Sequence, residues 1–194
     1  MLATRRRLTP PLAVAALALA LFAGCAPTPV ATTEPTGPNP GTPPPAGPTV
    51  APPTGATSTP VTQTCNDLVS PDTMYDFNPN FGLLDDFTPA KSSAGARATQ
   101  YKGLACRWQN QTSGEVVDLS VAHFDAGTTA SLHETAAKGT AVPALGDAFF
   151  TSEGSVGAVT VFNSGYWIVL ESPYFGTGED ATTLVASVTG ALTP

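Results

Sequence analysis

The chain has 194 residues and a formal net charge of −7, and only 12% of its residues are charged. Residues 65–194 carry five lysines and arginines against fourteen aspartates and glutamates, which gives this part a net charge of −9. A surface of this sign repels phosphate backbones and anionic lipid headgroups, so the composition argues against a nucleic-acid-binding protein.

The first 24 residues have the order of a signal peptide. Three arginines at positions 5–7 precede an apolar run at positions 12–23, which ends on Gly24 and Cys25. The run is shorter than the ~20 apolar residues that a membrane-spanning helix needs, so we expect it to be removed. Arg5-Arg6 followed by Leu8 leaves the twin-arginine export route open beside the general secretion route.

The four residues at positions 22–25, Phe-Ala-Gly-Cys, resemble the bacterial lipobox. The resemblance implies cleavage before Cys25, lipidation of that cysteine and anchoring to the extracytoplasmic face of the cell membrane, since two acyl chains anchor a protein stably. The alternative is ordinary secretion with a free Cys25.

Residues 25–64 form the expected linker. Positions 26–64 contain twelve prolines, eleven threonines, one charged residue (Glu34) and no aromatic residue. Such a segment cannot bury enough apolar surface to offset its ordering entropy. We therefore expect an extended spacer, and a proline-rich ligand for a partner protein is the alternative.

Residues 65–194 contain fourteen aromatic residues, enough for one domain with a single core. Two cysteines, Cys65 and Cys106, lie in this part of a chain that we expect to be exported, so we predict a disulfide between them. Closing a loop of about 40 residues stabilises a fold by ~4 kcal/mol in the chain-entropy model. A metal site is the alternative, although the chain lacks a CxxC motif or paired histidines to complete it.

Turn and cap signals divide the first half of this domain. Ser70-Pro71-Asp72 predicts the start of a short helix. Strands are expected at 104–109 and 117–122, paired through a turn at Ser113-Gly114. A weak helix follows, capped by Thr128 or Thr129 and ending at Lys138-Gly139.

The second half of the domain is predicted to form three strands and a helix. The strands are expected at 147–151, 156–163 and 166–171, and Ser164-Gly165 predicts a hairpin between the last two. Thr177 to Asp180 match a capping pattern before apolar residues at helical spacing. This order predicts an α+β fold, an antiparallel sheet of about five strands with helices packed on it as an α-β-β-α-β-β-β-α sandwich.

Three features of this domain carry a family resemblance. They are Cys65 at its start, Gly-Leu-Ala-Cys-Arg-Trp at 103–108 and Val-Pro-Ala-Leu-Gly-Asp-Ala at 142–148. In them the chain resembles a family of actinobacterial lipoproteins whose activity is not established and, more distantly, the extracellular sensor domains of mycobacterial-type serine/threonine kinases. Ala144 departs from the glycine common at that place. The resemblance implies a fold and a disulfide, and it assigns no catalytic residue.

We find no catalytic motif and no cofactor-binding motif, so neither an enzymatic activity nor a cofactor is predicted. The only histidines are His123 and His133. His133 begins an HExxH-like segment, but Ala137 stands where the second zinc ligand belongs. His123 and Asp125 share a strand face, which is better explained as a polar strand end than as a metal site.

Three functions remain, in order of preference: a module that binds or senses a small molecule or envelope component, a scaffold of an envelope complex, and a hydrolase. In the strand 166–171, alternation places Tyr166, Ile168 and Leu170 on the core face and Trp167 on the other face with Val169 and Glu171. Trp167 and Tyr174 are the candidates for a ligand surface, and burial of Trp167 in the core is the favoured alternative.

Overall fold

A computed structural model describes residues 55–193. The expected signal peptide, the expected lipidation site Cys25 and most of the expected linker lie outside these residues. The longest helices of the described part have 11 residues, and none is long and apolar enough to cross a membrane.

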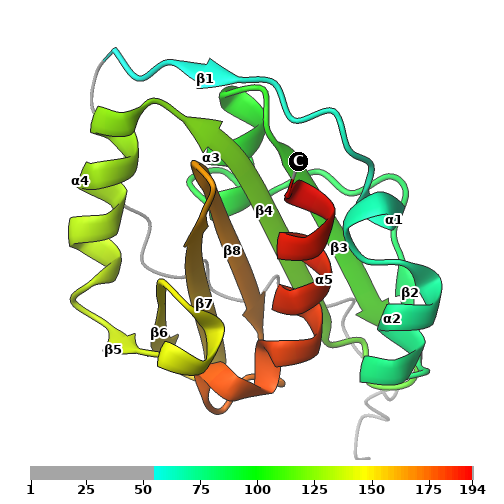
Figure 1. Ribbon diagram of the computed structural model, residues 1–194. Helices are drawn as coiled ribbons and strands as arrows, with labels where there is room; N and C mark the ends of the chain where they lie inside the picture. The colour runs from blue at the N-terminus through cyan, green and yellow to red at the C-terminus, as the bar shows by residue number, and fades with distance from the viewer. Residues whose placement is uncertain (1–54, 194) are drawn as a thin grey trace, which may run out of the picture. The chain divides into compact units, whose positions relative to one another are not determined.

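One antiparallel sheet of eight strands organises the described residues, in the order β2-β3-β4-β8-β7-β6-β5, with β1 paired to β4 (Figure 1). The α+β class is confirmed, but the expected count of about five strands is wrong. The three additional strands have only two or three residues, too few to show alternation in the sequence. The strands are β1 (Ser58–Thr59), β2 (Phe81–Leu83), β3 (Leu104–Asn110), β4 (Val116–Phe124), β5 (Thr140–Ala141), β6 (Ala148–Glu153), β7 (Val156–Asn163) and β8 (Tyr166–Ser172).

Five α-helices accompany the sheet within the described residues, and two of them, α1 and α3, were not expected from the sequence. Short 3₁₀ helices precede β6 and α5. The helices are α1 (Cys65–Leu68), α2 (Pro71–Phe77), α3 (Ala94–Gln100), α4 (Ala126–Ala136) and α5 (Thr182–Leu192), with η1 (Pro143–Leu145) and η2 (Gly178–Ala181).

Local signals account for most boundaries. Ser70 caps α2 by accepting a hydrogen bond from the Thr73 backbone, as expected. Ser164 and Gly165 both have positive φ, 51° and 84°, the conformation of a tight hairpin turn. The expected cap of α4 is wrong, because Asp125, not Thr128 or Thr129, is its N-cap. Strand β4 runs directly into this helix, which leaves no loop in which a later cap could lie.

One face of the sheet holds the main core. Alternate residues of β3, β4, β7 and β8 pack there against α1, α2 and α5, and α5 crosses this face in Figure 1. Leu119, Ile168, Leu170 and Leu184 are fully buried in this cluster. The expected core face of β8 is therefore confirmed.

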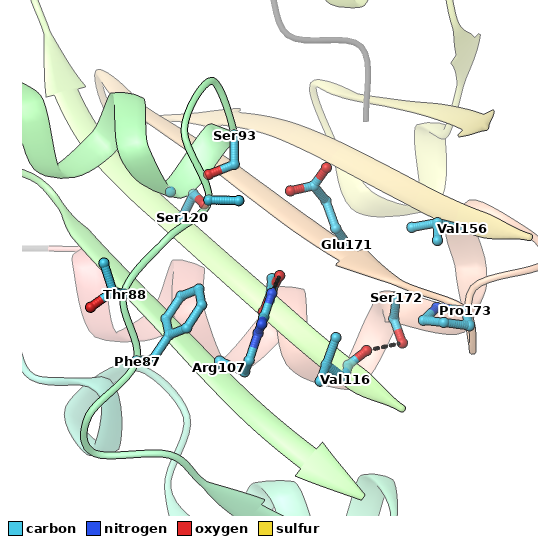
Figure 2. Close-up of a pocket in the computed structure, with 13 residues that line it drawn as sticks. Phe87, Thr88, Ser93, Arg107, Val116, Ser120, Val156, Glu171, Ser172 and Pro173 are labelled. Atoms are coloured by element: carbon cyan, nitrogen blue, oxygen red, sulfur yellow. Dashed lines mark hydrogen bonds and ion pairs between the residues drawn. The ribbon is translucent and has the colours of Figure 1, made fainter. Parts of the chain in front are cut away.

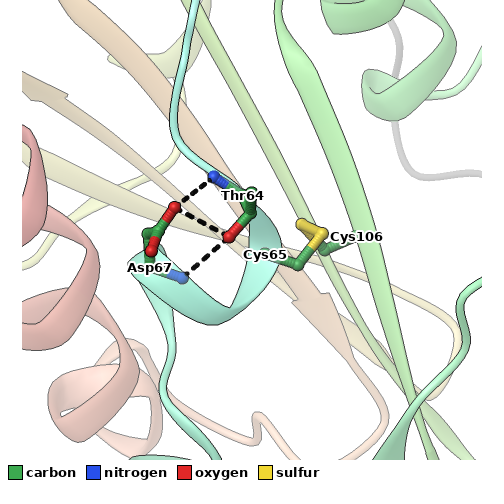
Figure 3. Close-up of a disulfide and its surroundings, with 4 residues drawn as sticks. All are labelled: Thr64, Cys65, Asp67 and Cys106. Carbon is green, nitrogen blue, oxygen red and sulfur yellow. Dashed lines mark hydrogen bonds between the residues drawn. A yellow bond between two sulfur atoms is a disulfide. The ribbon is translucent and has the colours of Figure 1, made fainter.

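The predicted disulfide lies on the same face. Cys65, the first residue of α1, is bonded to Cys106 on β3, with Cα atoms 5.8 Å apart (Figure 3). A capping box at Thr64 and Asp67 begins the helix. The Thr64 backbone and hydroxyl donate hydrogen bonds to the Asp67 carboxylate, and they lower its pKa. The disulfide and the cap together fix α1 against the sheet.

The second face of the sheet is covered by α3 and α4 at one end only. A smaller cluster there joins Ala98 of α3 and Leu132 of α4 to Phe124, Trp167 and Val169 of the sheet. Toward the opposite ends of β4 and β8, polar side chains replace apolar ones.

The folded domain begins before Cys65. Strand β1 pairs with β4, and the Thr57 backbone donates to Asp125 at 2.8 Å. The Val61 backbone donates to the Lys102 carbonyl. Residues 57–64, which composition places in the linker, therefore belong to the fold.

Candidate functional site

Three charged residues form a row across the second face of the sheet. In the strand register, Arg107 of β3 pairs with Asp118 of β4, and Asp118 pairs with Glu171 of β8. Residues directly opposite on neighbouring strands point to the same face, so the three side chains lie side by side. The row lies toward the ends of β4 and β8 that α3 and α4 leave uncovered.

Arg107 and Asp118 form a bidentate ion pair. Nε of Arg107 donates to Oδ1 of Asp118 at 2.6 Å, and Nη2 donates to Oδ2 at 2.5 Å. The guanidinium also stacks on the ring of Phe87, 4.2 Å from the ring centroid. Both side chains of the pair are about 20% exposed, so solvent reaches them from one side.

A cleft of about 240 Å³ opens over this row, and we call it the Arg107 cleft. Figure 2 shows Arg107 and Glu171 reaching into it from different strands, with Phe87 beside Arg107. The loop between β2 and α3 forms one wall, and the ends of β4, β7 and β8 form the other. The lining residues are Phe87, Thr88, Ala90, Ser93, Gly95, Arg107, Val116, Asp118, Ser120, Val156, Glu171, Ser172 and Pro173.

Two of the lining serines also hold the walls in place. Ser93 caps α3 by accepting a hydrogen bond from the Ala96 backbone at 3.1 Å. Ser172 donates to the carbonyl of Val116 at 2.9 Å, a bond drawn in Figure 2, and accepts from the Tyr174 backbone. The cleft is therefore built on hydrogen-bonded strand and helix ends.

A second guanidinium lies on the same face outside the cleft lining. Arg97 of α3 is 6% exposed and stacks over Trp167 at 5.5 Å, and its Nη2 has no hydrogen-bond partner. Burial lowers the pKa of Arg97, and Tyr101 partly offsets that effect. Arg97 thus covers the apolar side chains at this end of the face.

The two ligand-surface candidates predicted from the sequence lie outside the cleft lining. Trp167 is 4% exposed and packs in the second cluster. Tyr174 is partly buried against the main core, and its hydroxyl accepts from Asn110 Nδ2 at 2.9 Å. Its ring packs edge-on against Phe81.

The histidines make structural contacts elsewhere. His123 stacks on Tyr166, and His133 Nε2 lies 2.8 Å from Asp147 Oδ1, beside an open depression along α4. The Asp125 carboxylate accepts hydrogen bonds from Thr128 and Thr57, and these bonds hold its pKa well below the ordinary range.

The described residues contain no group of three or more histidine, cysteine, aspartate or glutamate side chains placed to hold a metal ion. Asp85 and Asp86 line a shallow depression that shares Phe87, Thr88 and Arg107 with the Arg107 cleft.

Sequence reasoning missed the charged row. A usable signal existed, because Arg107, Asp118 and Glu171 each interrupt a strand that is otherwise largely apolar. The predicted β3–β4 hairpin pairs the first two of these residues. The wall from the β2–α3 loop had no comparable signal, since residues 84–93 show neither strand nor helix periodicity.

Comparison with protein-family models, with curated proteins and with solved structures finds no match to this chain. The resemblance to actinobacterial lipoproteins therefore stays a prediction.

Proposed function

We propose that this chain is a lipid-anchored extracytoplasmic binding module that holds a small molecule in the Arg107 cleft. The observation that carries the proposal is the charged row on three neighbouring strands beneath a cleft with one aromatic wall. Small-molecule sites commonly combine apolar walls with a few polar groups that orient the ligand.

Folding alone gives little reason for such a row. An ion pair that solvent reaches, as it reaches Arg107 and Asp118, contributes only ~0–1 kcal/mol to stability. The opposite face of the same strands uses apolar side chains under helices. A polar row left accessible in a cleft is the arrangement that recognition requires.

The scaffold alternative has less support. A scaffold should present a contiguous exposed apolar patch to its partner. Among the described residues, Tyr75 is the only large hydrophobic side chain that is exposed. A single exposed aromatic ring does not form such a patch.

A hydrolase would also gather titratable groups in a cleft, so it remains the second candidate. Both oxygens of Asp118 accept hydrogen bonds from Arg107, which suits an ion pair more than a general base. His123 and His133 lie outside the cleft lining and cannot activate its serines. Binding without turnover is therefore the function that this geometry supports best.

The proposed anchor is tested separately. Replacing Cys25 with Ala should abolish fatty-acid labelling and release the chain from the membrane fraction. Retention in the membrane without label would contradict lipid anchoring and would leave the cleft proposal standing.

The cleft proposal is tested by purifying the native protein from membranes and identifying bound small molecules by mass spectrometry. The double variant Arg107→Met/Asp118→Leu should lose the bound molecule, because it removes both charges without leaving either one unpaired. The matched control, His133→Gln/Asp147→Asn, removes the polar pair beside α4 and should retain it.

Three outcomes would count against binding at the cleft. They are the absence of any bound molecule, equal retention by both double variants, and conversion of the molecule to a product during incubation with the pure protein. The last outcome would make the hydrolase the function.

A further inference from the structure

The three charged side chains that line the Arg107 cleft all have partners. Arg107 and Asp118 hold each other in a bidentate ion pair, which is among the strongest contacts that an arginine makes in a protein. Glu171 is also engaged in an interaction within the protein. A charged ligand would have to break one of these interactions to find a counter-charge, whereas a neutral ligand would not.

The lining of the cleft is nevertheless rich in polar side chains. Three charged residues and four with a hydroxyl group account for seven of its thirteen lining residues. Ligand pockets are more often lined mainly by apolar side chains, with a small number of polar groups. A ligand that forms hydrogen bonds on several sides therefore suits this cleft better than a hydrocarbon.

Ser120 of β4 carries an unpaired hydroxyl in the cleft. The residue is 2% exposed and belongs to the lining. Its neighbours in the strand register are Ala105 and Val169, whose side chains offer no hydrogen-bond partner. Within residues 55–193 the Ser120 hydroxyl forms no hydrogen bond, and its oxygen is not sealed from solvent, so it faces the cleft. Buried polar groups are nearly always paired, so this hydroxyl points to a ligand that hydrogen-bonds to it.

A second hydroxyl lies at the same end of the cleft. Helix α3 begins close to the sheet here, because a Cβ atom at Gly95 would lie 3.2 Å from that of Ala105, the register neighbour of Ser120. Ser93, the N-cap of α3, thereby lies near Ser120 (Figure 2). Its oxygen accepts from the Ala96 backbone, which leaves its O–H free to donate.

The spacing of these groups sets the size of the ligand. Ser120 follows Asp118 by two residues on the same face of β4, a distance of about 7 Å along a strand. A six-membered ring with hydroxyl groups on opposite carbons spans such a gap. The cleft volume of about 240 Å³ lies below the ~300–1,000 Å³ of typical drug-sized sites, which restricts the ligand to a single ring.

Resting on the binding function proposed above, we infer that the Arg107 cleft selects a neutral cyclic polyol of the size of one sugar ring. A hydroxyl group is both donor and acceptor, so one side of the ring can accept from the N–H groups that Arg107 does not give to Asp118 and donate to the remaining lone pairs of Asp118. Hydroxyls on the other side bond Ser93 and Ser120. The ion pair stays intact throughout.

The test uses probes built on one ring size that differ in their substituents. The two polyols are myo-inositol and D-glucose, and the matched rings are cyclohexanol, cyclohexylamine and cyclohexanecarboxylate. Each is titrated calorimetrically into the purified full-length chain, in a detergent without a sugar headgroup. At least one polyol should bind, and the three matched rings should not.

Substitutions then locate the site. Ser120→Ala should weaken polyol affinity about two- to twelvefold, the loss expected for one neutral hydrogen bond, and it should leave the urea midpoint of unfolding unchanged because the hydroxyl has no partner within the protein. Ser131→Ala, which removes a hydroxyl from an exposed position on α4 outside the cleft, should leave the affinity unchanged. Arg107→Met/Asp118→Leu should abolish polyol binding, because it removes the donors and acceptors at the other end of the ring.

Absence of binding by both polyols would overturn the inference. So would binding of any of the three matched rings as tightly as the polyols, or a polyol affinity that Ser120→Ala and Ser131→Ala change equally. A urea midpoint lowered by Ser120→Ala would show that its hydroxyl serves the fold, and it too would count against the inference. The binding function itself fails separately, when the membrane-purified protein carries no molecule that depends on Arg107 and Asp118.

Discussion

The two faces of the sheet are built from alternate residues of the same strands, yet they are covered differently. Leu170 is fully buried beneath the helices of the main core, whereas its neighbour Glu171 lines the Arg107 cleft. Residues one apart on a strand point to opposite faces, so one strand can serve both purposes. The comparison indicates that the closed face, which holds the main core, supplies most of the stability and that part of the other face stays open to solvent.

The first prediction concerns Trp167, which lies at the covered end of the second face. Trp167→Ala should cost about 3–5 kcal/mol, because the ring is 4% exposed and packs against Phe124 and Arg97. Urea denaturation of the full chain measures the loss. A cost near 1 kcal/mol would mean that this end of the face is also open, and it would restore Trp167 as a ligand-surface candidate.

How much the sequence reveals also differs between the two faces. On the closed face, alternation in β8 and the apolar spacing of α5 made the core residues predictable, since burial of a whole face imposes a period. On the other face, α3 was missed because its buried side chains are mainly small: Ala94 and Ala98, beside Gly95, give almost no hydrophobic period. Each charged residue of the row could be identified within its own strand. The contact between Arg107 and Phe87 could not be predicted, because Phe87 lies in a loop whose position no local sequence pattern determines.

The second prediction concerns the stability that the disulfide contributes to the closed face. Replacing Cys65 and Cys106 together with Ala should cost ~4 kcal/mol in the chain-entropy model, since the bond closes a loop with a sequence separation of 41. Denaturant unfolding of the double variant and intact mass without reductant measure the two parts of this claim. Free alkylation of both thiols in native protein would show that α1 is held by packing alone.

A smaller effect is expected at Asp125, which caps α4 on the second face. Hydrogen bonds from Thr128 and then Thr57 lower the pKa of Asp125, so its ionised form stabilises the folded state. That contribution is complete well above the ordinary carboxyl pKa of ~3.9, and it is lost as the pH falls through the lower folded value.

Wild type should therefore unfold at higher urea than Asp125→Ala at pH 7, and the difference should shrink as the pH falls below about 4. Asp76→Ala, which removes an exposed charge from α2, controls for net charge. A difference that stays constant between pH 7 and pH 2 would show that the carboxylate charge does not support the cap.

The smallest stability effect is expected at Glu171, and it tests the comparison most directly. Glu171→Gln keeps the shape of the side chain in a solvent-accessible cleft, so it should change the free energy of unfolding by less than about 1 kcal/mol. Leu170→Ala, one residue earlier, should cost about 2–5 kcal/mol, because it opens a cavity in the main core. Equal losses in urea melts would mean that Glu171 is part of the structural framework at this point of the second face. A large loss at Leu170 beside a near-neutral change at Glu171 would separate the two roles within a single strand.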